Sequence, residues 1–341
     1  MPPLRASRER ILAFRRRVGA LDERLPWSAP SLRTAAWAGL QDSMPRAALL
    51  SIHARVEGAG PDAWEDPALV QVWGPRYGVY VVAQEDLAVF TLGRLPGHGK
   101  RRFAEELAGR LDELLAGSRM RYDDAGDALG THGNNLRYAA LTGRLAIRWE
   151  GARRPLVWVV PPPEIGEDEA ARELGRRYLH VFGPGTAAGF GRWASVGARQ
   201  AAAVFDALAP ELVAVLTPVG EALLLASDEP ALREEPQPPA PARLLPSGDA
   251  YTLGVTPEER ALLVPDHTQR SELWTPRVWP GAVLAGGKVV GTWRRAQRTM
   301  TIQAWGRLTP AVREAVVAEA EALPLPDPGQ GMSIRWTRHP S

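Results

Sequence analysis

Apolar residues at helical spacing begin the chain, and they start an order of elements that recurs. Ile11, Phe14 and Val18 follow one another every three to four residues, which predicts an amphipathic helix. Two more helices are expected near residues 32–40 and 45–55. The stretch LVQVWGPRYGVYVV then places two apolar runs around a Gly-Pro-containing turn, which predicts a β-hairpin, and a helix in QEDLAVFTL follows it.

The same order of elements returns in a second and a third copy. In the second copy, Phe103, Leu107 and Leu111 share one helical face, RYDDAGDAL and NNLRYAALTG predict two shorter helices, and LAIRWEGARRPLVWVV predicts a hairpin. Asn134 is a candidate N-cap of the third helix in this copy, and Gly143 is a candidate stop. In the third copy, DEAARELGRRYLHVFG, AAGFGRWA and ARQAAAVFDAL predict helices and LVAVLTPVGEALLLAS a hairpin.

The chain changes character after the third copy. DEPALREEPQPPAPAR has the proline-rich, polar composition of a linker. VLAGGKVVGTWRRAQRTMTIQAW then offers three β-rich runs, and TPAVREAVVAEAEAL predicts a final helix with Thr309 as its cap. The tail from Pro324 is expected to be poorly ordered, although Ile334 and Trp336 could dock it.

Three helices followed by a two-stranded hairpin is the order of a winged-helix domain, and a supersecondary unit is rarely repeated by chance. We therefore predict an α+β protein with three tandem winged-helix domains and a small, barrel-like β-rich domain after them. The expected division is winged-helix domain 1 at 1–98, domain 2 at 99–165, domain 3 at 166–228, a linker at 229–243, the β-rich domain with its final helix at 244–325, and a tail at 326–341.

The composition of the chain excludes several kinds of site. Of its 341 residues, 45% are hydrophobic, which is enough for several packed cores. Cysteine is absent, so disulfides, thiolate nucleophiles and cysteine metal sites are excluded. The six histidines are scattered, and the sequence contains no matching glycine-rich phosphate loop or G-x-S-x-G elbow. We therefore expect neither a metal nor another cofactor.

Charge and hydropathy leave the partner open. No apolar run is long enough to span a bilayer, and MPPLRASRERILAFRRR lacks the apolar stretch of a secretory signal. We expect a soluble cytoplasmic protein, associated with the nucleoid when it binds DNA, and favour a monomer. The net charge of +2 and the pI of about 9.1 allow a polyanionic partner without requiring one. Arginines cluster in RERILAFRRR, GKRR, GARRP and GTWRRAQR, which fits a solvated surface or phosphate contacts.

A winged helix offers a physical route to DNA, because its third helix can lie in a groove while basic residues of the wing contact phosphates. Asparagine and arginine can also contact base edges. The candidates in the second copy are His132, Asn134, Asn135 and Arg137 on the third helix, and Arg153 and Arg154 at the hairpin tip. The alternative is that Asn134 caps the helix and the arginines are solvated. Winged helices also mediate protein contacts, so the fold alone does not establish DNA binding.

Five segments of the sequence together resemble one protein family. They are GLQDSMPRAALLSIHARV, WGPRYGVYVVAQEDL, ELGRRYLHVFGPGTAAGFGRW, RLLPSGDAYTLG and VLAGGKVVGTWR. Over about residues 5–325 the chain is similar to the tandem winged-helix DNA glycosylases of the AlkZ/YcaQ type, bacterial DNA-repair proteins that remove bulky alkylated bases and unhook interstrand crosslinks. The resemblance implies double-stranded DNA, alkylated or crosslinked, as the partner and hydrolysis of N-glycosidic bonds as the reaction.

The resemblance also assigns candidate catalytic residues in domain 1, and the sequence departs from the family there. Active members carry Gln-x-Gln, or Gln-x-Asp in a sister branch, with an apolar middle residue. Gly39, Leu40 and Gln41 fit the start of this motif. Asp42 replaces the apolar residue, and Ser43 stands where the second glutamine or the aspartate is expected.

A second family motif is altered as well. The usual W-x-x-R-G-T-x-H stretch reads Trp73, Arg76, Tyr77, Gly78 and Tyr80 in this chain. A tyrosine therefore stands in place of the histidine. We include Arg76 among the candidate DNA contacts.

The chemistry explains why these departures matter. The glycosidic bond of a cationic alkylated purine is already weak. The enzyme mainly has to hold a water against the sugar carbon and stabilise oxocarbenium-like charge, which a glutamine carbonyl or a carboxylate can do. A serine hydroxyl is shorter and is a poor base near neutral pH.

Three interpretations of this segment remain open. Asp42 or Ser43 can cap the helix that contains Pro45. Gln41 and Asp42 can form a rearranged water-binding pair, although adjacent side chains point in different directions. Alternatively, the site has lost glycosylase activity while the fold still binds DNA, as a regulator or a damage recogniser. The modest net charge also leaves a protein-interaction scaffold open.

Overall fold

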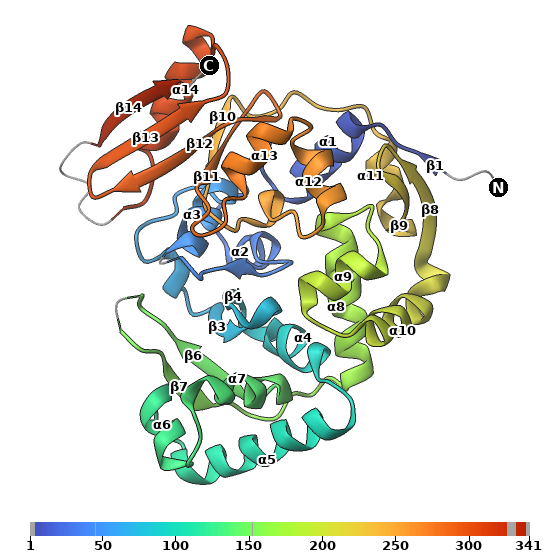
Figure 1. The fold of residues 1–341 in the computed structure, drawn as a ribbon, viewed down its shortest axis with the longest axis vertical. Coiled ribbons are helices and arrows are strands. Elements are labelled where there is room, and N and C mark those ends of the chain that lie inside the picture. Colours follow the sequence, from blue (N-terminus) through green and yellow to red (C-terminus); the bar gives the residue numbers. More distant parts are fainter. Residues whose placement is uncertain (1–3, 45, 152, 326–331, 339–341) are drawn as a thin grey trace.

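The computed structural model describes residues 4–44, 46–151, 153–325 and 332–338. Within these ranges, helices and strands alternate in a mixed α and β architecture (Figure 1). None of the described helices is both long and apolar enough to cross a membrane.

The predicted helices and hairpins of the three copies are present. The first copy contains α1 (Arg8–Val18), α2 (Ala29–Ala35), β2 (Leu40–Gln41), α3 (Ala47–Arg55), β3 (Leu69–Trp73), β4 (Val79–Ala83) and α4 (Leu87–Thr91). The second contains α5 (His98–Leu115), β5 (Met120–Arg121), α6 (Tyr122–Ala128), α7 (Leu136–Ala139), β6 (Leu145–Arg148) and β7 (Leu156–Val159). The third contains α8 (Glu167–Phe182), α9 (Ala187–Ala194), α10 (Ala198–Leu208), β8 (Leu212–Thr217) and β9 (Gly220–Leu225).

The second helix of the first copy is shorter than predicted. It ends at Ala35 rather than near residue 40. Gly39 then adopts a φ of +71°, and an added Cβ there would lie 2.9 Å from the ring of Tyr80. Glycine therefore fits both the left-handed backbone and the close packing. Leu40 and Gln41 follow as an extended edge strand.

The third helix of the second copy also differs from the prediction. The expectation that Asn134 caps it is wrong, because the backbone N–H of Asn134 donates to Nδ1 of His132, which caps a 3₁₀ turn before the helix. Asn135 donates from its side chain to Thr131 Oγ1. Gly143 ends the helical segment with a φ of +78°, as predicted.

The hairpins of the first two copies belong to one six-stranded sheet. Its order is β2-β4-β3-β6-β7-β5, which leaves β2 at an edge. Gln41 on β2 lies opposite Tyr80 on β4. The two hairpins join where Gln71 on β3 lies opposite Ile147 on β6. This pairing brings the second hairpin next to the segment that contains Gln41.

The third copy packs around an aromatic cluster. Tyr178, Phe182, Phe190 and Trp193 are fully or almost fully buried, and the ring of Tyr178 contacts each of the other three. The segment β1 (Leu4–Arg5) extends the sheet of this copy by pairing in parallel with β8.

The segment expected to be a linker begins with a helix. The helix α11 (Glu229–Arg233) carries Pro230 in its first turn, where the missing N–H removes no helical hydrogen bond. Residues 234–241 contain no helix or strand and keep the proline-rich character that was predicted.

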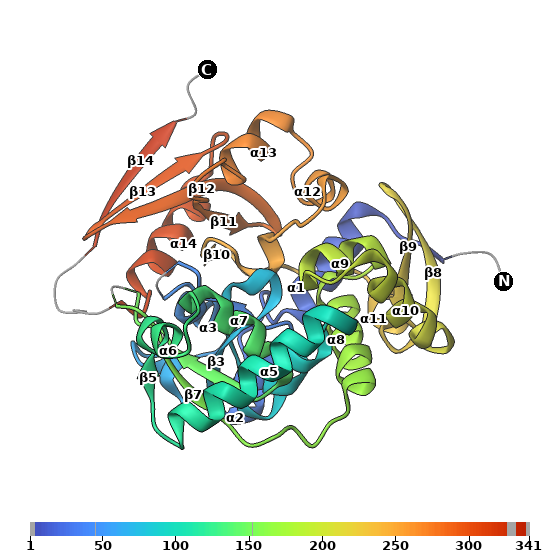
Figure 2. The ribbon, with the colours of Figure 1, turned by 60° about the horizontal axis from the view of Figure 1, so that its bottom comes forward.

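The C-terminal region is a five-stranded sheet rather than the three strands expected. Its order is β10 (Ala242–Leu245), β11 (Gly281–Ala285), β12 (Lys288–Ala296), β13 (Thr299–Ala304) and β14 (Ser333–Arg338), with α12 (Pro257–Leu263) and α13 (His267–Leu273) between β10 and β11. The final helix α14 (Pro310–Glu321) lies along one face of the sheet (Figure 2). Trp336 on β14 docks the tail, with the guanidinium carbon of Arg313 4.5 Å from its ring centroid. The rest of the predicted tail, 326–331 and 339–341, lies outside the described residues.

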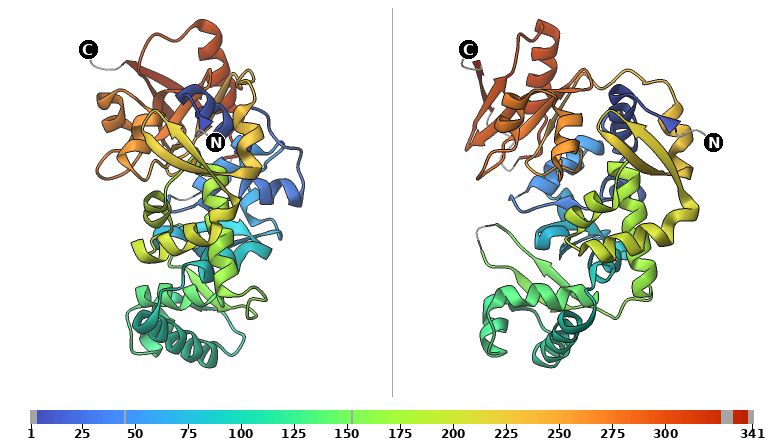
Figure 3. Two further views of the ribbon diagram at one scale, coloured as in Figure 1. Left: turned by 90° about the vertical axis from the view of Figure 1, so that its right-hand side faces the viewer. Right: turned by 45° about the vertical axis from the view of Figure 1, so that its right-hand side comes forward.

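The first copy lies between the second copy and the C-terminal sheet, as the turned views show (Figure 3). Its apolar side chains also pack with those of the C-terminal region, since Leu12 and Leu21 share a buried cluster with Leu245, Tyr251 and Trp274. Buried packing of this kind stabilises the arrangement of segments that are far apart in the sequence. The segment that contains Gln41 is therefore bordered by two other parts of the fold.

Candidate nucleic-acid interface

Gln41 is a partly exposed side chain held from two sides. Arg76, in the turn between β3 and β4, donates from Nη2 to Oε1 of Gln41 at 2.7 Å. On the other side, Gly248 packs so closely that an added Cβ would lie 2.9 Å from the same oxygen. Gly248 also has a φ of +78°. The amide of Gln41 is thereby fixed between a guanidinium and a glycine of the C-terminal region.

Asp42 points away from Gln41 and is completely buried. Its Oδ1 accepts from the backbone N–H of Ala48 at 3.1 Å, in the first turn of α3. Its Oδ2 accepts from Gln71 Nε2 at 2.9 Å and lies 3.6 Å from Arg46 Nη1. Burial raises the pKa of Asp42 to about 6, although these donors favour the ionised form.

Asp42 thus supports the first turn of α3 through the N–H of Ala48, although Arg46 occupies the N-cap position and makes no side-chain cap bond. The helix begins at Ala47, and Pro45 lies outside the described residues. Because adjacent residues of an extended strand face opposite sides, Gln41 and Asp42 do not converge on one point. Ser43 is exposed and follows them into the loop before α3.

Gln71 ties Asp42 to the second hairpin. Besides its bond to Asp42, its side chain accepts from the backbone N–H of Trp149 at 2.7 Å and donates to the carbonyl of Trp149 at 3.3 Å. Buried amides keep such positions only when their donors and acceptors are satisfied. The position of the segment after Gln41 therefore depends on the second copy as well as the first.

The turn that carries Arg76 is strained. Arg76 and Tyr77 have φ angles of +55° and +54°, a region that side chains other than glycine rarely adopt. Tyr80, which stands where the resemblance has a histidine, is buried below this turn. Burial raises the pKa of Tyr80 and the nearby Arg76 opposes that shift. Tyr80 is thus a neutral, inward-facing group at neutral pH.

A cavity of about 540 Å³ lies between this turn and the β6–β7 hairpin. We call it the arginine hollow. Among the residues that the structure describes, four guanidinium side chains and no carboxylate line it, together with the aromatic rings of Trp73, Tyr77, Tyr122 and Trp149. The arginines are Arg76, Arg137, Arg153 and Arg154, and Ser43 joins them from the candidate catalytic segment.

The arginines of the hollow have few anionic partners among the described residues. Nε of Arg137 has no hydrogen-bond partner there. Arg153 is exposed and has no ion pair there either. Arg154 donates to the hydroxyl of Tyr122 at 3.1 Å and lies 3.3 Å from Asp123. Positive charge without matching carboxylates attracts a polyanion such as DNA.

The structure brings only some of the predicted site residues together. Arg76, Arg137, Arg153 and Arg154 share the hollow, with Ser43 at its wall. Three other candidates of the second copy do not line the hollow and form hydrogen bonds within the turn before α7. They are His132, Asn134 and Asn135.

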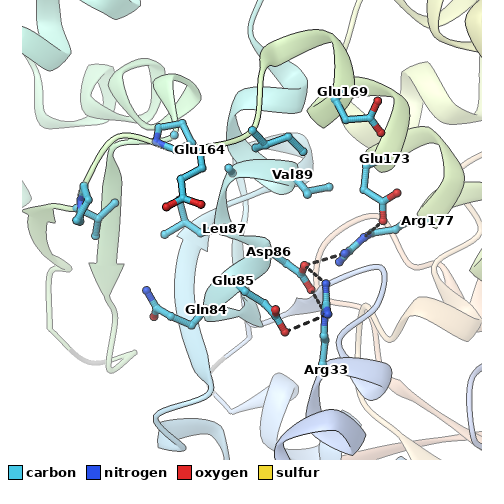
Figure 4. Close-up of a pocket in the computed structure, with 16 residues that line it drawn as sticks. Arg33, Gln84, Glu85, Asp86, Leu87, Val89, Glu164, Glu169, Glu173 and Arg177 are labelled. Atoms are coloured by element: carbon cyan, nitrogen blue, oxygen red, sulfur yellow. Dashed lines mark hydrogen bonds and ion pairs between the residues drawn. The ribbon is translucent and has the colours of Figure 1, made fainter.

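A second cavity, of about 600 Å³, has the opposite charge (Figure 4). It lies beside α4 and α8 and carries five carboxylates against two guanidinium groups. Within this cavity, Asp86 is paired with Arg33 at 2.8 Å and with Arg177 at 2.7 Å. Both guanidinium groups of the cavity are therefore already neutralised by a carboxylate. This cavity does not suit a nucleic acid.

Three residues that shape the site are not among the candidates predicted from the sequence. Gln71 and Gly248 hold the segment as described above. Asp249 follows Gly248 and anchors that loop to α3, accepting from both terminal nitrogens of Arg55 at 2.7 and 2.8 Å. Arg55 and other donors hold the pKa of Asp249 below its usual range even though burial opposes this. The signal was the family-like stretch RLLPSGDAYTLG, which had no assigned role.

The described residues contain no group of three or more histidine, aspartate and glutamate side chains suited to a metal ion. The prediction that no metal is required remains a prediction.

Comparison with known proteins gives consistent similarities. The family model described as DNA glycosylase AlkZ-like matches residues 34–324. An interstrand DNA cross-link repair glycosylase from Streptomyces sahachiroi is 25% identical over 226 residues, which span 58% of each chain. The solved structure of Streptomyces sahachiroi DNA glycosylase AlkZ superimposes with a TM-score of 0.79 at 20% identity, covering 98% of this chain and 100% of that one. This structural likeness supports the fold.

Proposed function

Because this chain belongs to the family of AlkZ-like DNA glycosylases, we propose that it binds double-stranded DNA at the arginine hollow and hydrolyses the N-glycosidic bond of alkylated bases. The observation that carries the proposal is the position of Ser43, at the end of the candidate catalytic segment, in the wall of a cavity lined by four arginines. The named activity of the Streptomyces relative makes alkylated or crosslinked duplexes the substrate class that we propose.

We propose the domain division predicted above, with three tandem winged-helix domains and a C-terminal β-rich domain. The helix-and-hairpin order of each copy supports it. The shared sheet of the first two copies means that their hairpins would act as a single DNA-facing surface. We also propose that the protein acts as a monomer in the cytoplasm, at the nucleoid.

In this proposal the arginines hold phosphates. Guanidinium groups form paired, charge-assisted hydrogen bonds with phosphate oxygens. Arg153 at the hairpin tip and Arg137 at the third helix of the second copy lie at the positions from which a winged helix reaches DNA. His132, Asn134 and Asn135 would contact DNA only outside the hollow.

Gln41 is the group that we propose to position the attacking water. Its Oε1 has two lone pairs, and Arg76 uses one of them, so the second can accept a hydrogen bond from water. A held water can attack the sugar carbon as the bond to the cationic base breaks, and the base leaves as a neutral molecule with the electron pair of that bond. The proton of the water passes to the solvent, and the dipole of the amide stabilises the developing positive charge. The hydrogen bond from Arg76 holds the amide of Gln41 in one orientation.

Asp42 and Ser43 take different roles in the proposal. Asp42 is sealed below the segment, so it supports the site through the first turn of α3 and can act on the sugar only through its field. Ser43 faces the hollow, where its hydroxyl can donate to a phosphate or to the water. Neither side chain supplies the second carbonyl oxygen of the family motif to the water, because Asp42 is buried and Ser43 carries only a hydroxyl.

The presence of Ser43 at the position of the second glutamine favours one other candidate function, a DNA-binding protein without glycosylase activity. With Asp42 buried, the motif leaves only the amide of Gln41 and the weakly basic hydroxyl of Ser43 to hold a water. Such a protein would recognise damaged DNA or regulate access to it.

Base release and DNA binding distinguish the two candidates. Purified full-length protein is incubated with a duplex that contains 7-methylguanine and, separately, with a crosslinked duplex. We expect free base to appear and affinity to fall as salt rises, because phosphate contacts release counterions. Binding without base release would support the non-catalytic candidate, and the absence of both would contradict DNA binding at the hollow.

A further inference from the structure

Three aromatic side chains lie in a row from the arginine hollow to the helices α7 and α5 of the second copy. The ring centroid of Tyr77 lies 5.6 Å from that of Tyr138, and Tyr138 lies 5.7 Å from Phe103. Tyr77 lines the hollow, Tyr138 is on α7, and Phe103 is on α5 with 42% of its surface exposed. We call these three residues the aromatic row.

The backbone at the start of the aromatic row is strained at Tyr77. Tyr77 has a φ of +54°, where a glycine would be unstrained. A large side chain in the left-handed region is destabilising. Strain that persists at the rim of a cationic cavity points to a use for the side chain.

Tyr77 is held from the protein side by a buried cation. The guanidinium carbon of Arg94 lies 5.0 Å from the ring centroid of Tyr77. Arg94 is itself buried, and it donates to the carbonyl oxygens of Gly74 and Ala194. Burial lowers the pKa of Arg94 to about 10, which still leaves it charged at neutral pH. Arg94 thus contacts the ring of Tyr77 from within the protein.

The rings of the aromatic row are tilted against one another. Their planes meet at 58° for Tyr77 and Tyr138 and at 72° for Phe103 and Tyr138. Tilted rings do not cover one another completely, and the exposed surface of Phe103 remains for a flat partner. Tyr77 and Tyr138 are both partly exposed. A nucleobase is such a partner, because every base has a π-face that stacks on an aromatic ring.

Cations without partners flank the aromatic row. Arg137 precedes Tyr138 on α7, and its Nε has no hydrogen-bond partner among the described residues. Lys100 stands one helical turn before Phe103, is exposed, and has no ion pair in the described part of the chain. Stacking rings combined with cations that can reach the backbone are the features of a surface for unpaired nucleic acid.

We propose that the aromatic row and its flanking cations bind the unpaired nucleotides of a DNA strand beside the damaged position. The inference rests on the proposed DNA binding at the hollow. In a fully paired duplex the base faces are stacked on one another and are not available to the rings. The protein therefore prefers a duplex that continues into a single strand over the same duplex with blunt ends.

The test compares two DNA probes with the full-length protein. One is a blunt duplex, and the other is the same duplex extended by a single strand of about ten nucleotides, within the length that one stacking surface covers. The single strand carries 2-aminopurine, whose fluorescence is quenched when it stacks on an aromatic ring. We expect wild type to bind the extended probe about tenfold more tightly, since stacking contributes about 1–3 kcal/mol per base, and to quench the fluorophore.

The variant Phe103→Ala/Tyr138→Ala removes two rings. We expect it to lose both the preference and the quenching while its affinity for the blunt duplex stays unchanged. Tyr138→Phe keeps the ring and should keep both properties. Trp27→Ala is the matched control, because Trp27 is an aromatic residue with 44% exposure that belongs to neither the row nor the hollow. Its preference should equal that of wild type.

The outcomes separate this proposal from the proposed function. If wild type binds both probes equally and without quenching, the aromatic row does not bind unpaired bases, although DNA binding stands. If wild type binds neither probe, DNA binding itself fails. A loss of blunt-duplex affinity in Phe103→Ala/Tyr138→Ala, with an unchanged unfolding midpoint, would place the row in contact with paired DNA and overturn the proposal.

Discussion

Arg76 and Gln41 form the link between the strained β3–β4 turn and the candidate catalytic segment. Nη2 of Arg76 donates to Oε1 of Gln41 at 2.7 Å, and the same arginine lines the arginine hollow. One side chain therefore connects the proposed site of phosphate binding to the amide that is proposed to hold water. The effect of the Arg76 hydrogen bond on Gln41 can therefore be measured separately from the effect of the positive charge of Arg76 on DNA binding.

Arg76→Lys tests that role. Lysine keeps the positive charge but loses the rigid fork of the guanidinium, so it cannot fix the amide as well. We expect the rate of base release to fall about tenfold, as for a misplaced reacting group, with duplex affinity nearly unchanged. Arg153→Lys is the control and should leave the rate intact. Equal rates in Arg76→Lys and wild type would show that the hydrogen bond does not matter for the reaction.

Gly248→Ala tests whether the C-terminal region positions Gln41. Alanine at a φ of +78° is strained, and its Cβ would also lie 2.9 Å from Oε1 of Gln41. Gly58→Ala is the matched control, because Gly58 has a φ of +66° with no atom within 4 Å of an added Cβ. We expect each variant to lose about 1–2 kcal/mol of stability from backbone strain. Base release should slow in Gly248→Ala alone; slowing in both would point to a general effect of strain.

Asp42→Asn tests the buried carboxyl through the pH dependence of stability. The pKa of Asp42 is raised in the folded state, to about 6 from 3.8. The protonated carboxyl therefore contributes to the free energy of unfolding fully below about pH 4, and this contribution is lost as pH rises through 6. The loss amounts to about 3 kcal/mol, at 1.36 kcal/mol per pKa unit. Asparagine does not titrate.

Urea unfolding of wild type and Asp42→Asn at pH 4.5 and pH 8 measures this difference. We expect the stability of wild type relative to the variant to be greater at pH 4.5. Subtracting the two proteins removes the titration of all other groups that both share. A difference that does not change with pH would show that Asp42 titrates at its ordinary pKa.

Arg153→Ala tests the phosphate contacts of the hollow. A protein that neutralises one phosphate fewer loses about 0.9 from the slope of log affinity against log salt concentration. We expect the slope to decrease by about one in Arg153→Ala. Arg233→Ala is the control, since Arg233 is an exposed arginine on α11 that pairs with Glu229 and does not line the hollow. An unchanged slope in Arg153→Ala would exclude a phosphate contact at the hairpin tip.

The apolar pattern was sufficient to predict most local elements. Helical spacing at Ile11, Phe14 and Val18 corresponds to α1, and the two runs around Gly-Pro correspond to β3 and β4. Periodicity records which side of an element is buried, and this is a local property. The extra C-terminal strands were missed because β10 and β14 lie far from the recognised hairpin and are stabilised by pairing with distant residues.

The site was harder to predict for the same reason. The polar run of Gln41, Asp42 and Ser43 does not reveal that Asp42 is buried, because its donor Gln71 comes from another strand. The short distance between Gly248 and Gln41 depends on how the C-terminal region packs on the first copy. By contrast, Arg153 at a predicted hairpin tip was placed correctly, since a turn between two strands is a local feature.

The central claim is that Gln41 faces the damaged nucleotide of DNA bound at the arginine hollow. Its most direct test is single-turnover release of 7-methylguanine from a duplex by wild type and Gln41→Ala, with the affinity of each for the same duplex measured in parallel. The account predicts a rate at least about a hundredfold lower in Gln41→Ala, as for the loss of a group that positions or activates water, with affinity within a factor of about two. An active wild type whose rate is unchanged in Gln41→Ala would contradict it.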